Sequence, residues 1–500
     1  MRFAVIAMEI LFFLVVAYFA LYVLLELRIL LISRKLGRGQ SHAPARPALS
    51  VPSVLSASDF FPPVAVLLPI CNETSVIDRL VPAVCKLDYP PNLLEILVLD
   101  DSTDETSDRA FALVASHAAC GCPVRYLKRN SRTGFKAENL RYGVSHAQAD
   151  FFAVFDADFV PPPDFLLQTI PCFKNDKLGY LQTGIGYINR DASFLTKFQA
   201  AEMQHQQFVT AGLRADGNMA SLSGSSCVWR RTCLEALGGW NATTATEDVD
   251  IGYRAQLDDW EYAYLKDVVS LSVLPETVSA FRIQRERWGR GLLHSAFRHG
   301  MRIFRRRMSM TKRLYAISMM FSSLLLVSIY CLFLLTLPLT WAKPFEGTAF
   351  GVVCMLFFVL VAVWGAGNVA ASQMWEALGK GGSALKKCLG LYGYIAMFLP
   401  MSLYYSAGGV RALMGVYEEF NTTPKGKDET SFVKPQIDAV LFYGEVFSFF
   451  YSCAALAVAA YTKYYSMLPF NITACVAFAM VLYWGWRDKA ARAGKTYAGH

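Results

Sequence analysis

Apolar segments long enough to cross a bilayer flank a long polar stretch in this chain of 500 residues. Residues 3–32 form the first, and they exceed the roughly 20 residues that a membrane-spanning helix needs. They also exceed the roughly 7–15 apolar residues of a signal peptide, and the basic pair Arg34-Lys35 follows them. We therefore expect residues 1–35 to be an uncleaved membrane anchor. The composition agrees, because 54% of the residues are hydrophobic.

Apolar segments of membrane-spanning length also follow the polar stretch. We predict two spans within 312–375 and two within 438–488. Segment 389–409 is broken by Gly, Pro, Ser and Tyr. The basic tail 489–500 should lie in the cytosol with the polar stretch, which requires an even number of later crossings. We therefore expect an interfacial helix and a loop over 376–437, whereas a crossing there would place the tail outside. The chain is then an integral, multi-pass protein of a plasma or inner membrane.

Charge and cysteine content exclude other classes. The net charge of +8 can indicate nucleic-acid binding, but much of the basic surplus lies beside apolar segments, as in 298–312. The positive-inside rule explains this placement, and we expect no nucleic-acid partner. The 12 cysteines are scattered, and the pair Cys120-Gly-Cys122 lacks the spacing of a zinc knuckle. We therefore expect reduced, mostly structural thiols.

The polar stretch alternates between strand-like and helix-like runs. A linker over 36–62, rich in Pro, Ser and Ala, precedes it. We predict strands at 64–70, 95–100, 124–128 and 151–158, separated by helices at 74–87, 104–117 and 136–147. This alternation indicates an α/β domain over 63–275 with a mainly parallel, doubly wound, Rossmann-like sheet. The amphipathic stretches 196–212 and 276–311 favour helices at the membrane surface.

Carboxylates follow two of these predicted strands. Ligands gather at the carboxyl edge of a parallel sheet, so Asp101, Asp156 and Asp158 can converge there. Asp156 and Asp158 can hold a Mg²⁺ or Mn²⁺ ion that also contacts the diphosphate of a nucleotide sugar. A solvated acidic turn before Pro161 is the alternative for this pair.

Other residues at the same edge suit the nucleotide. Asp101 can bind the nucleotide or its ribose, Asn72-Glu73 can line a base pocket, and Lys136 offers a cation to the phosphates. Taken alone, Glu73 and Lys136 are more often surface charges.

Asp248, in Thr246-Glu247-Asp248, is our candidate for the base that takes a proton from an acceptor hydroxyl. Helix capping is the alternative for Thr246 and Asp248, which precede a predicted helix at 248–257. Ser102 and Thr103 can likewise cap the helix that follows the second strand.

Residues 284–288 read Gln-Arg-Glu-Arg-Trp. Arg287 can donate two parallel hydrogen bonds to diphosphate oxygens, and Trp288 offers a flat apolar face to a sugar ring. The alternative is an arginine-rich interfacial helix that only anchors the domain. Together the ordered motifs supply a metal site, a base and a clamp for the leaving group, which indicates sugar transfer at a membrane.

The motifs DDSTDE, DAD, TED and QRERW, in this order, make the chain resemble the processive family 2 glycosyltransferases, the cellulose, mannan and hyaluronan synthase group. The resemblance implies a GT-A catalytic domain in the cytosol, inserted among membrane helices that form a channel. It implies that Asp101 binds nucleotide, that Asp156 and Asp158 serve metal and donor, and that Asp248 is the base. It also implies that Gln284, Arg287 and Trp288 hold diphosphate and acceptor.

Two shorter segments extend this resemblance. Ser-Gly-Ser-Ser at 223–226 is similar to the acceptor-side loop of the family, which implies that Gly224 and Ser225, together with Glu247, bind the acceptor.

Residues 420–425 are similar to the gating loop FxVTxK of cellulose synthases, with Thr422 in place of Val. The similarity implies that Thr423 and Lys425 reach the diphosphate and exclude water.

The resemblance implies an inverting, metal-dependent synthase that extends a β-linked glucan or mannan from a UDP- or GDP-sugar and exports it across the bilayer. It is nearest to the cellulose synthase-like enzymes, and glucose versus mannose stays open, as do partner subunits. One alternative is a single-addition enzyme that glycosylates a lipid, similar to ceramide glucosyltransferase. A transporter or scaffold that merely binds nucleotide is a different class, and neither a repeated span pattern nor an intramembrane charge pair in the sequence points to it.

Overall fold

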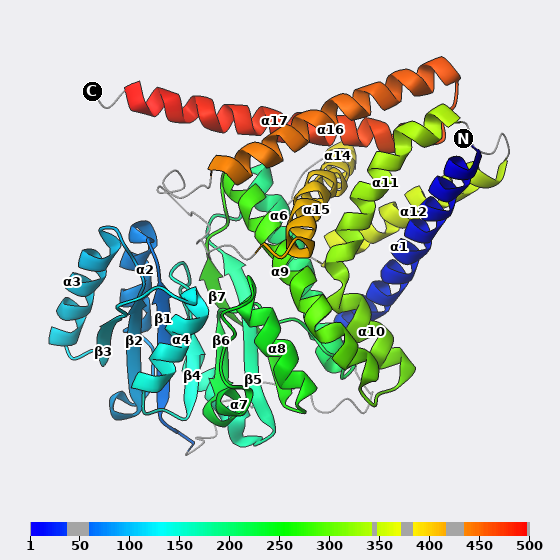
Figure 1. Ribbon diagram of the computed structural model, residues 1–500. Helices are drawn as coiled ribbons and strands as arrows, with labels where there is room; N and C mark the ends of the chain where they lie inside the picture. Colours follow the sequence, from blue (N-terminus) through cyan, green and yellow to red (C-terminus); the bar gives the residue numbers. More distant parts are fainter. Residues whose placement is uncertain (1, 38–59, 343–347, 372–383, 417–434, 498–500) are drawn as a thin grey trace.

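The computed structural model describes residues 2–37, 60–342, 348–371, 384–416 and 435–497 (Figure 1). The gating-type residues Thr423 and Lys425 lie outside these ranges.

Seven strands form one sheet in the order β3-β2-β1-β4-β6-β5-β7. They are β1 Val64–Ile70, β2 Leu94–Asp100, β3 Val124–Lys128, β4 Phe151–Val154, β5 Leu178–Tyr187, β6 Cys227–Arg230 and β7 Glu261–Ser272. Only β6 runs antiparallel to its neighbours, β4 and β5. The prediction of a mainly parallel α/β sheet is confirmed.

Helices cover both faces of the sheet (Figure 1). Residues of α2 (Thr74–Val84) and α3 (Thr106–Ala119) pack with one face, and those of α4 (Phe135–His146), α7 (Arg231–Leu237) and α8 (Glu247–Leu257) pack with the other. In β1, Val64 and Val66 face the first layer, whereas Ala65 and Leu67 face the second. An all-apolar strand forms here because both of its faces are buried, as is usual in parallel sheets.

The predicted strand 151–158 proved too long. Strand β4 ends at Val154, and the chain then turns, with the Phe159 amide donating to the carbonyl of Asp156. The two aspartates of the DAD motif therefore stand in a loop beyond the strand. The sheet order places this loop between the ends of β1 and β6, near the centre of the sheet.

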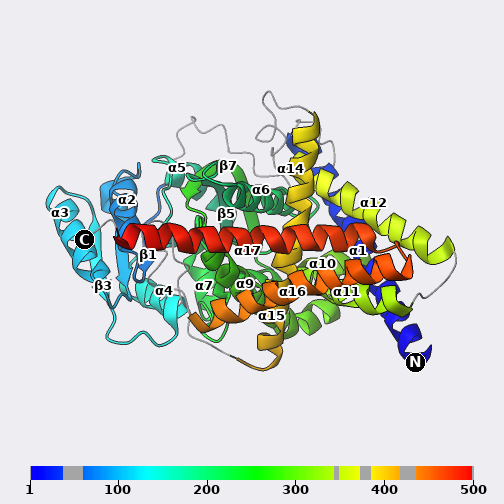
Figure 2. The ribbon, with the colours of Figure 1, turned by 90° about the horizontal axis from the view of Figure 1, so that it is seen from above.

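Long helices form the rest of the described chain (Figures 1 and 2). They are α1 Arg2–Gly37, α6 Phe194–Ala215, α9 Val278–Arg305, α10 Met310–Met320, α11 Ser322–Ala342, α12 Thr348–Ala371, α14 Ala384–Ala396, α15 Phe398–Leu413, α16 Pro435–Thr462 and α17 Leu468–Tyr497. In both views α16 and α17 lie side by side, and in Figure 1 α9 lies between the sheet and the outer helices.

Five helical segments in the described ranges are long and apolar enough to cross a membrane. They are Val5–Lys35, Ser322–Ala342, Leu385–Leu413, Gln436–Thr462 and Leu468–Ala490. This set includes the segment that we expect to lie in the interface. The second predicted span within 312–375 appears only as a shorter apolar helix, Val352–Asn368.

A buried ion pair and a disulfide join residues that are far apart in the sequence. Glu445 of α16, inside an apolar segment, forms a buried ion pair with Arg282 of α9 through two N···O contacts of 2.6 Å. The partners are far apart in the chain, so no local spacing signals the pair. Cys85 and Cys122 form a disulfide, which corrects the expectation of reduced thiols for these two residues.

Helices α9 and α15 pack almost backbone to backbone. A methyl group at Gly408 would lie 2.3 Å from the carbonyl oxygen of Glu286, and one at Gly289 would lie 2.8 Å from the α-carbon of Tyr405. Such an approach is possible only without side chains at these positions. The contact holds in place the helix that carries the QRERW motif.

Candidate active site

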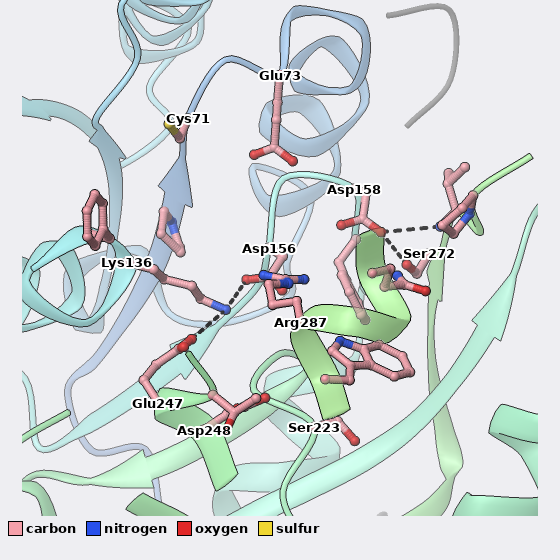
Figure 3. A pocket seen from close by; sticks show the side chains of 18 of the residues that line it. Cys71, Glu73, Lys136, Asp156, Asp158, Ser223, Glu247, Asp248, Ser272 and Arg287 are labelled. Atoms are coloured by element: carbon pink, nitrogen blue, oxygen red, sulfur yellow. Dashed lines mark hydrogen bonds and ion pairs between the residues drawn. The ribbon is translucent and has the colours of Figure 1, made fainter. Parts of the chain in front are cut away.

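A deep cleft opens at the carboxyl edge of the sheet, where α8 and α9 approach it (Figure 3). It encloses about 1320 Å³, including open solvent at its mouth. The site residues predicted from the sequence that line it are Glu73, Asp101, Lys136, Asp156, Asp158, Glu247, Asp248, Gln284, Arg287 and Trp288. Residues from both ends of a segment of more than 200 positions thus meet around one space.

The two aspartates of the DAD motif have different surroundings (Figure 3). Asp156 contacts the Lys136 ammonium at 2.6 Å, and its amide donates to the Ser225 hydroxyl. Asp158 is buried and accepts hydrogen bonds from the Ser272 hydroxyl and the Val273 amide at the end of β7. Because these bonds tie Asp158 to the scaffold, the alternative of a solvated acidic turn does not describe it.

Lys136 stands among the carboxylates of the cleft. Its ammonium lies 2.6 Å from Asp156 and 3.4 Å from Glu247. Burial alone would lower the pKa of Lys136, but Asp156, Glu247 and Asp248 outweigh it and raise the pKa. Lys136 therefore stays charged and screens three acids from one another.

Asp248 lines the cleft from the first turn of α8. Burial and the neighbouring Glu247 raise its pKa to about 7, against the opposing effect of Lys136. A carboxylate with a pKa near neutrality is suited to accept a proton at physiological pH. Helix capping describes these residues only in part. Asp248 accepts a hydrogen bond of 2.8 Å from the adjacent Val249 amide, but the Thr246 side chain makes no capping hydrogen bond to α8.

The loop at 223–226 approaches Asp248 closely. Gly224 has a φ of +74°, and a methyl group there would lie 2.4 Å from a carboxylate oxygen of Asp248. The Gly224 carbonyl also lies 3.4 Å from the Lys136 ammonium. Ser225 bonds to the Asp156 backbone instead of lining the cleft. The loop thus joins the DAD and TED motifs.

Asp100 and Asp101, the two adjacent acids of the DDSTDE loop, have different hydrogen-bond partners. Asp100 accepts from Ser102, Ser107 and Tyr126, and although burial opposes ionisation, these bonds lower its pKa. It is therefore a structural anchor of the loop, and neither Ser102 nor Thr103 caps α3.

Asp101 lines the cleft and receives two hydrogen bonds from Arg129, of 3.0 and 2.5 Å. The same guanidinium donates to the carbonyls of Thr133 and Phe135. Arg129 therefore fixes both Asp101 and the turn that leads into α4 and Lys136.

Helix α9 presents Gln284, Arg287 and Trp288 to the opposite wall of the cleft. Burial lowers the pKa of Arg287, against the effects of Glu247, Asp248 and Asp156. The cost of burying this cation falls when an anion enters the cleft. The guanidinium of Arg285 lies 4.3 Å from the ring centroid of Trp288, so one face of the indole is already covered.

The part of the chain that holds the cleft is similar to known proteins. A sequence model described as "Glycosyltransferase like family 2" matches residues 62–291, which contain every motif of the cleft. The chain carries a family 2 glycosyltransferase domain. The domain is similar to the probable glucomannan 4-beta-mannosyltransferase 4 of Oryza sativa subsp. japonica, with 37% identity over 236 residues. That match covers 46% of this chain and 43% of the relative, so this chain spans less than half of the relative's length.

The fold resembles that of a solved mannosyltransferase from Pyrobaculum calidifontis, determined in complex with GDP-Man and Mn²⁺. The TM-score is 0.55 at 18% identity, over 81% of this chain and 99% of that one. This likeness supports a GT-A-like fold for the glycosyltransferase domain.

Sequence reasoning missed two arginines of the glycosyltransferase domain. Arg129 holds Asp101, and Arg132 lines the cleft, where it donates to the sulfur of Cys71 at 3.0 Å. Both follow β3. Applying the strand-end rule to this third strand would have identified them, although no acidic motif marks the loop.

Proposed function

We propose that the chain is an inverting, metal-dependent hexosyltransferase that extends a β-linked polysaccharide of the mannan or glucan type from a nucleotide sugar. The convergence of the DAD, TED and QRERW motifs on one cleft carries this proposal. Such an arrangement supplies groups for a diphosphate, a proton acceptor and a sugar-binding face.

Asp156 and Asp158 fit a divalent cation of the Mg²⁺ or Mn²⁺ type. Both line the cleft and offer oxygen ligands, and Mg²⁺ in nucleotide sites uses one or two carboxylates together with phosphates and water. In the described ranges, no group of three or more His, Cys, Asp or Glu is arranged to hold a metal by itself. We therefore expect the donor's phosphates to complete the coordination. The cation, when bound, neutralises charge on the diphosphate leaving group.

Asp101 and Glu73 are proposed to bind the nucleoside, and Lys136, Gln284 and Arg287 the diphosphate. Arg287 offers planar paired donors suited to phosphate oxygens. Lys136 now neutralises Asp156 and Glu247, and it can shift its contact toward an arriving diphosphate.

In the reaction, an acceptor hydroxyl gives its proton to the Asp248 carboxylate as its oxygen bonds to the anomeric carbon. The bond from that carbon to the diphosphate oxygen breaks, and the nucleoside diphosphate leaves with the electron pair. A single displacement of this kind inverts the anomeric configuration. Trp288 supports the acceptor ring, and Gly224 leaves room beside the base.

A GDP-sugar, and GDP-mannose in particular, is the donor that we propose. The rice relative is named a probable mannosyltransferase, and the structural neighbour was solved with GDP-Man and Mn²⁺.

A second cavity supports a polymeric acceptor and its export. It encloses about 1090 Å³, including open solvent, and is lined by residues of α1, α6, α8, α9, α10, α11, α12 and α15. Its wall mixes aromatic rings such as Trp364 with hydroxyl and amide groups such as Thr210 and Asn368. None of the described residues that line it is Lys or Arg, so it suits a neutral glycan better than a lipid phosphate. We propose that product leaves through this cavity, from a cytosolic active site across the bilayer.

A donor screen tests this function. The purified chain in lipid nanodiscs with Mn²⁺ is given radiolabelled GDP-mannose, GDP-glucose or UDP-glucose. We expect the label from GDP-mannose in a long product that β-mannanase digests. Label that organic solvent extracts would favour the lipid glycosyltransferase, and no transfer from any donor would refute the proposal.

A further inference from the structure

One buried arginine supports the tryptophan of the QRERW motif. The Arg285 guanidinium lies 4.3 Å from the ring centroid of Trp288 and 5.0 Å from that of Phe281, both on α9. Cations bind to aromatic faces, and a planar guanidinium also stacks on them. The orientation of Trp288 therefore depends on where Arg285 is held.

A carboxylate on another helix holds Arg285. Its guanidinium donates to one oxygen of Glu202 at 2.9 Å and contacts the other at 2.6 Å. The two side chains are 1% and 5% exposed. Burial raises the pKa of Glu202, whereas Arg285 opposes the shift. A two-point contact fixes the plane of the guanidinium as well as its position.

This ion pair lies between the two cavities. Arg285 and Trp288 line the catalytic cleft, whereas Glu202 lines the second cavity among the helices. The pair therefore stands where an acceptor would pass from one space to the other. Its place also explains why Glu202, 83 positions away from Arg285, reaches the acceptor side of the cleft.

We propose that Glu202 is a positioning residue for the acceptor, and that it sets the plane of Trp288 through the Arg285 guanidinium. This inference rests on the proposed function. Glu202 itself contacts no reacting atom, so donor binding does not depend on it.

The test compares Glu202→Gln with the unmodified chain in nanodiscs. Two quantities are measured: the ratio of labelled sugar in polymer to free sugar released by donor hydrolysis, and the affinity for GDP. We expect the ratio to fall about ten- to a hundredfold, because small misplacements of a substrate have effects of this size. The affinity for GDP should change less than twofold.

Glu445→Gln is the matched control. Glu445 also forms a buried two-point ion pair with an arginine of α9, Arg282, one turn before Arg285. It lies outside both cavities. We expect Glu445→Gln to lower thermal stability at least as much as Glu202→Gln and to leave the ratio unchanged.

The double variant Glu202→Gln/Arg285→Gln separates positioning from charge neutralisation. In Glu202→Gln the buried Arg285 cation loses its carboxylate partner, and the double variant removes that cation. Trp288 still lacks its support, so we expect the ratio of sugar in polymer to free sugar to stay low. A ratio restored to the unmodified value would overturn the inference, as would an unchanged ratio in Glu202→Gln. Failure of the unmodified chain to transfer sugar would instead refute the proposed function and this inference together.

Discussion

The two walls of the cleft hold their charged residues in different ways. On the sheet wall, loops after strands present Asp101, Asp156 and Asp158. Arg129 holds Asp101, and Lys136, which lines the cleft, contacts Asp156. On the helical wall, one helix presents Gln284, Arg287 and Trp288, and buried ion pairs to distant helices hold that helix.

The difference indicates that the two walls respond differently when substrates bind. The Lys136 ammonium on the sheet wall can exchange a carboxylate for a phosphate when the donor binds, at little cost in desolvation. The pairs behind the helical wall are buried, with side chains at most 5% exposed, and breaking one leaves an uncompensated buried charge. We therefore expect the sheet wall to adapt to the donor and the helical wall to remain rigid for the acceptor.

Asp156→Asn should have the largest effect of the variants that sharpen this contrast. It removes one proposed metal ligand and the partner of Lys136 while keeping the shape of the side chain. We expect turnover to fall at least about a hundredfold, because electrostatic stabilisation of the leaving group is a large term. Steady-state kinetics at increasing Mn²⁺ measure this. Full activity at ordinary Mn²⁺ concentrations would exclude Asp156 from the metal site.

Gly224→Ala tests the close contact between the 223–226 loop and the Asp248 carboxylate. The added methyl group would overlap the Asp248 carboxylate, and φ at this position strains any L-residue. We expect turnover to fall about ten- to a hundredfold, since a displaced base loses most general-base catalysis. GDP affinity, measured by calorimetry, should hardly change. Unaltered turnover in Gly224→Ala would show that the loop does not constrain the base.

The pH dependence of turnover reports on Asp248. Its carboxylate must be ionised to accept a proton, and its pKa is raised to about 7. Activity should therefore be present above this pH and decline below it, by about tenfold between pH 8 and pH 6. A divalent cation beside Asp156 would favour the ionised form of Asp248 and so move this decline in activity to lower pH. A flat profile from pH 5 to pH 8 would contradict the assignment.

Gly408→Ala tests the rigidity of the helical wall, with Gly409→Ala as its neighbour control. The first methyl group would overlap the backbone of α9, whereas the second would meet a side-chain carbon of Leu293 at 3.3 Å. We expect Gly408→Ala to lower the free energy of unfolding by about 1–3 kcal/mol and turnover a few-fold. Thermal melts in nanodiscs measure the difference, and equal melting of both variants would refute tight packing at α9.

The sheet wall was largely predictable from sequence. Runs of apolar residues ending in carboxylates identify strand ends, and parallel strands bring those ends together, as for Asp101 and Asp156. Strands β5 to β7 escaped this reasoning, although helices α6 to α8 separate them in the chain.

The support of the helical wall was not predictable. The pairs Glu202–Arg285 and Arg282–Glu445 join residues 83 and 163 positions apart, so no local period or spacing connects them. Only the packing of α6, α9 and α16 brings these charges together. The motif identifies Trp288, but not what orients it.

The central claim is that one cleft binds the donor and separately supplies the base. It is tested most directly by Asp248→Asn, with GDP-mannose affinity and turnover measured on the same preparation. We expect affinity within about twofold of the unmodified chain and turnover lower by about 10²–10⁴-fold, the usual contribution of a general base. Retained synthesis in Asp248→Asn would remove Asp248 from the mechanism, and loss of donor binding would show that the base and the donor site do not act separately.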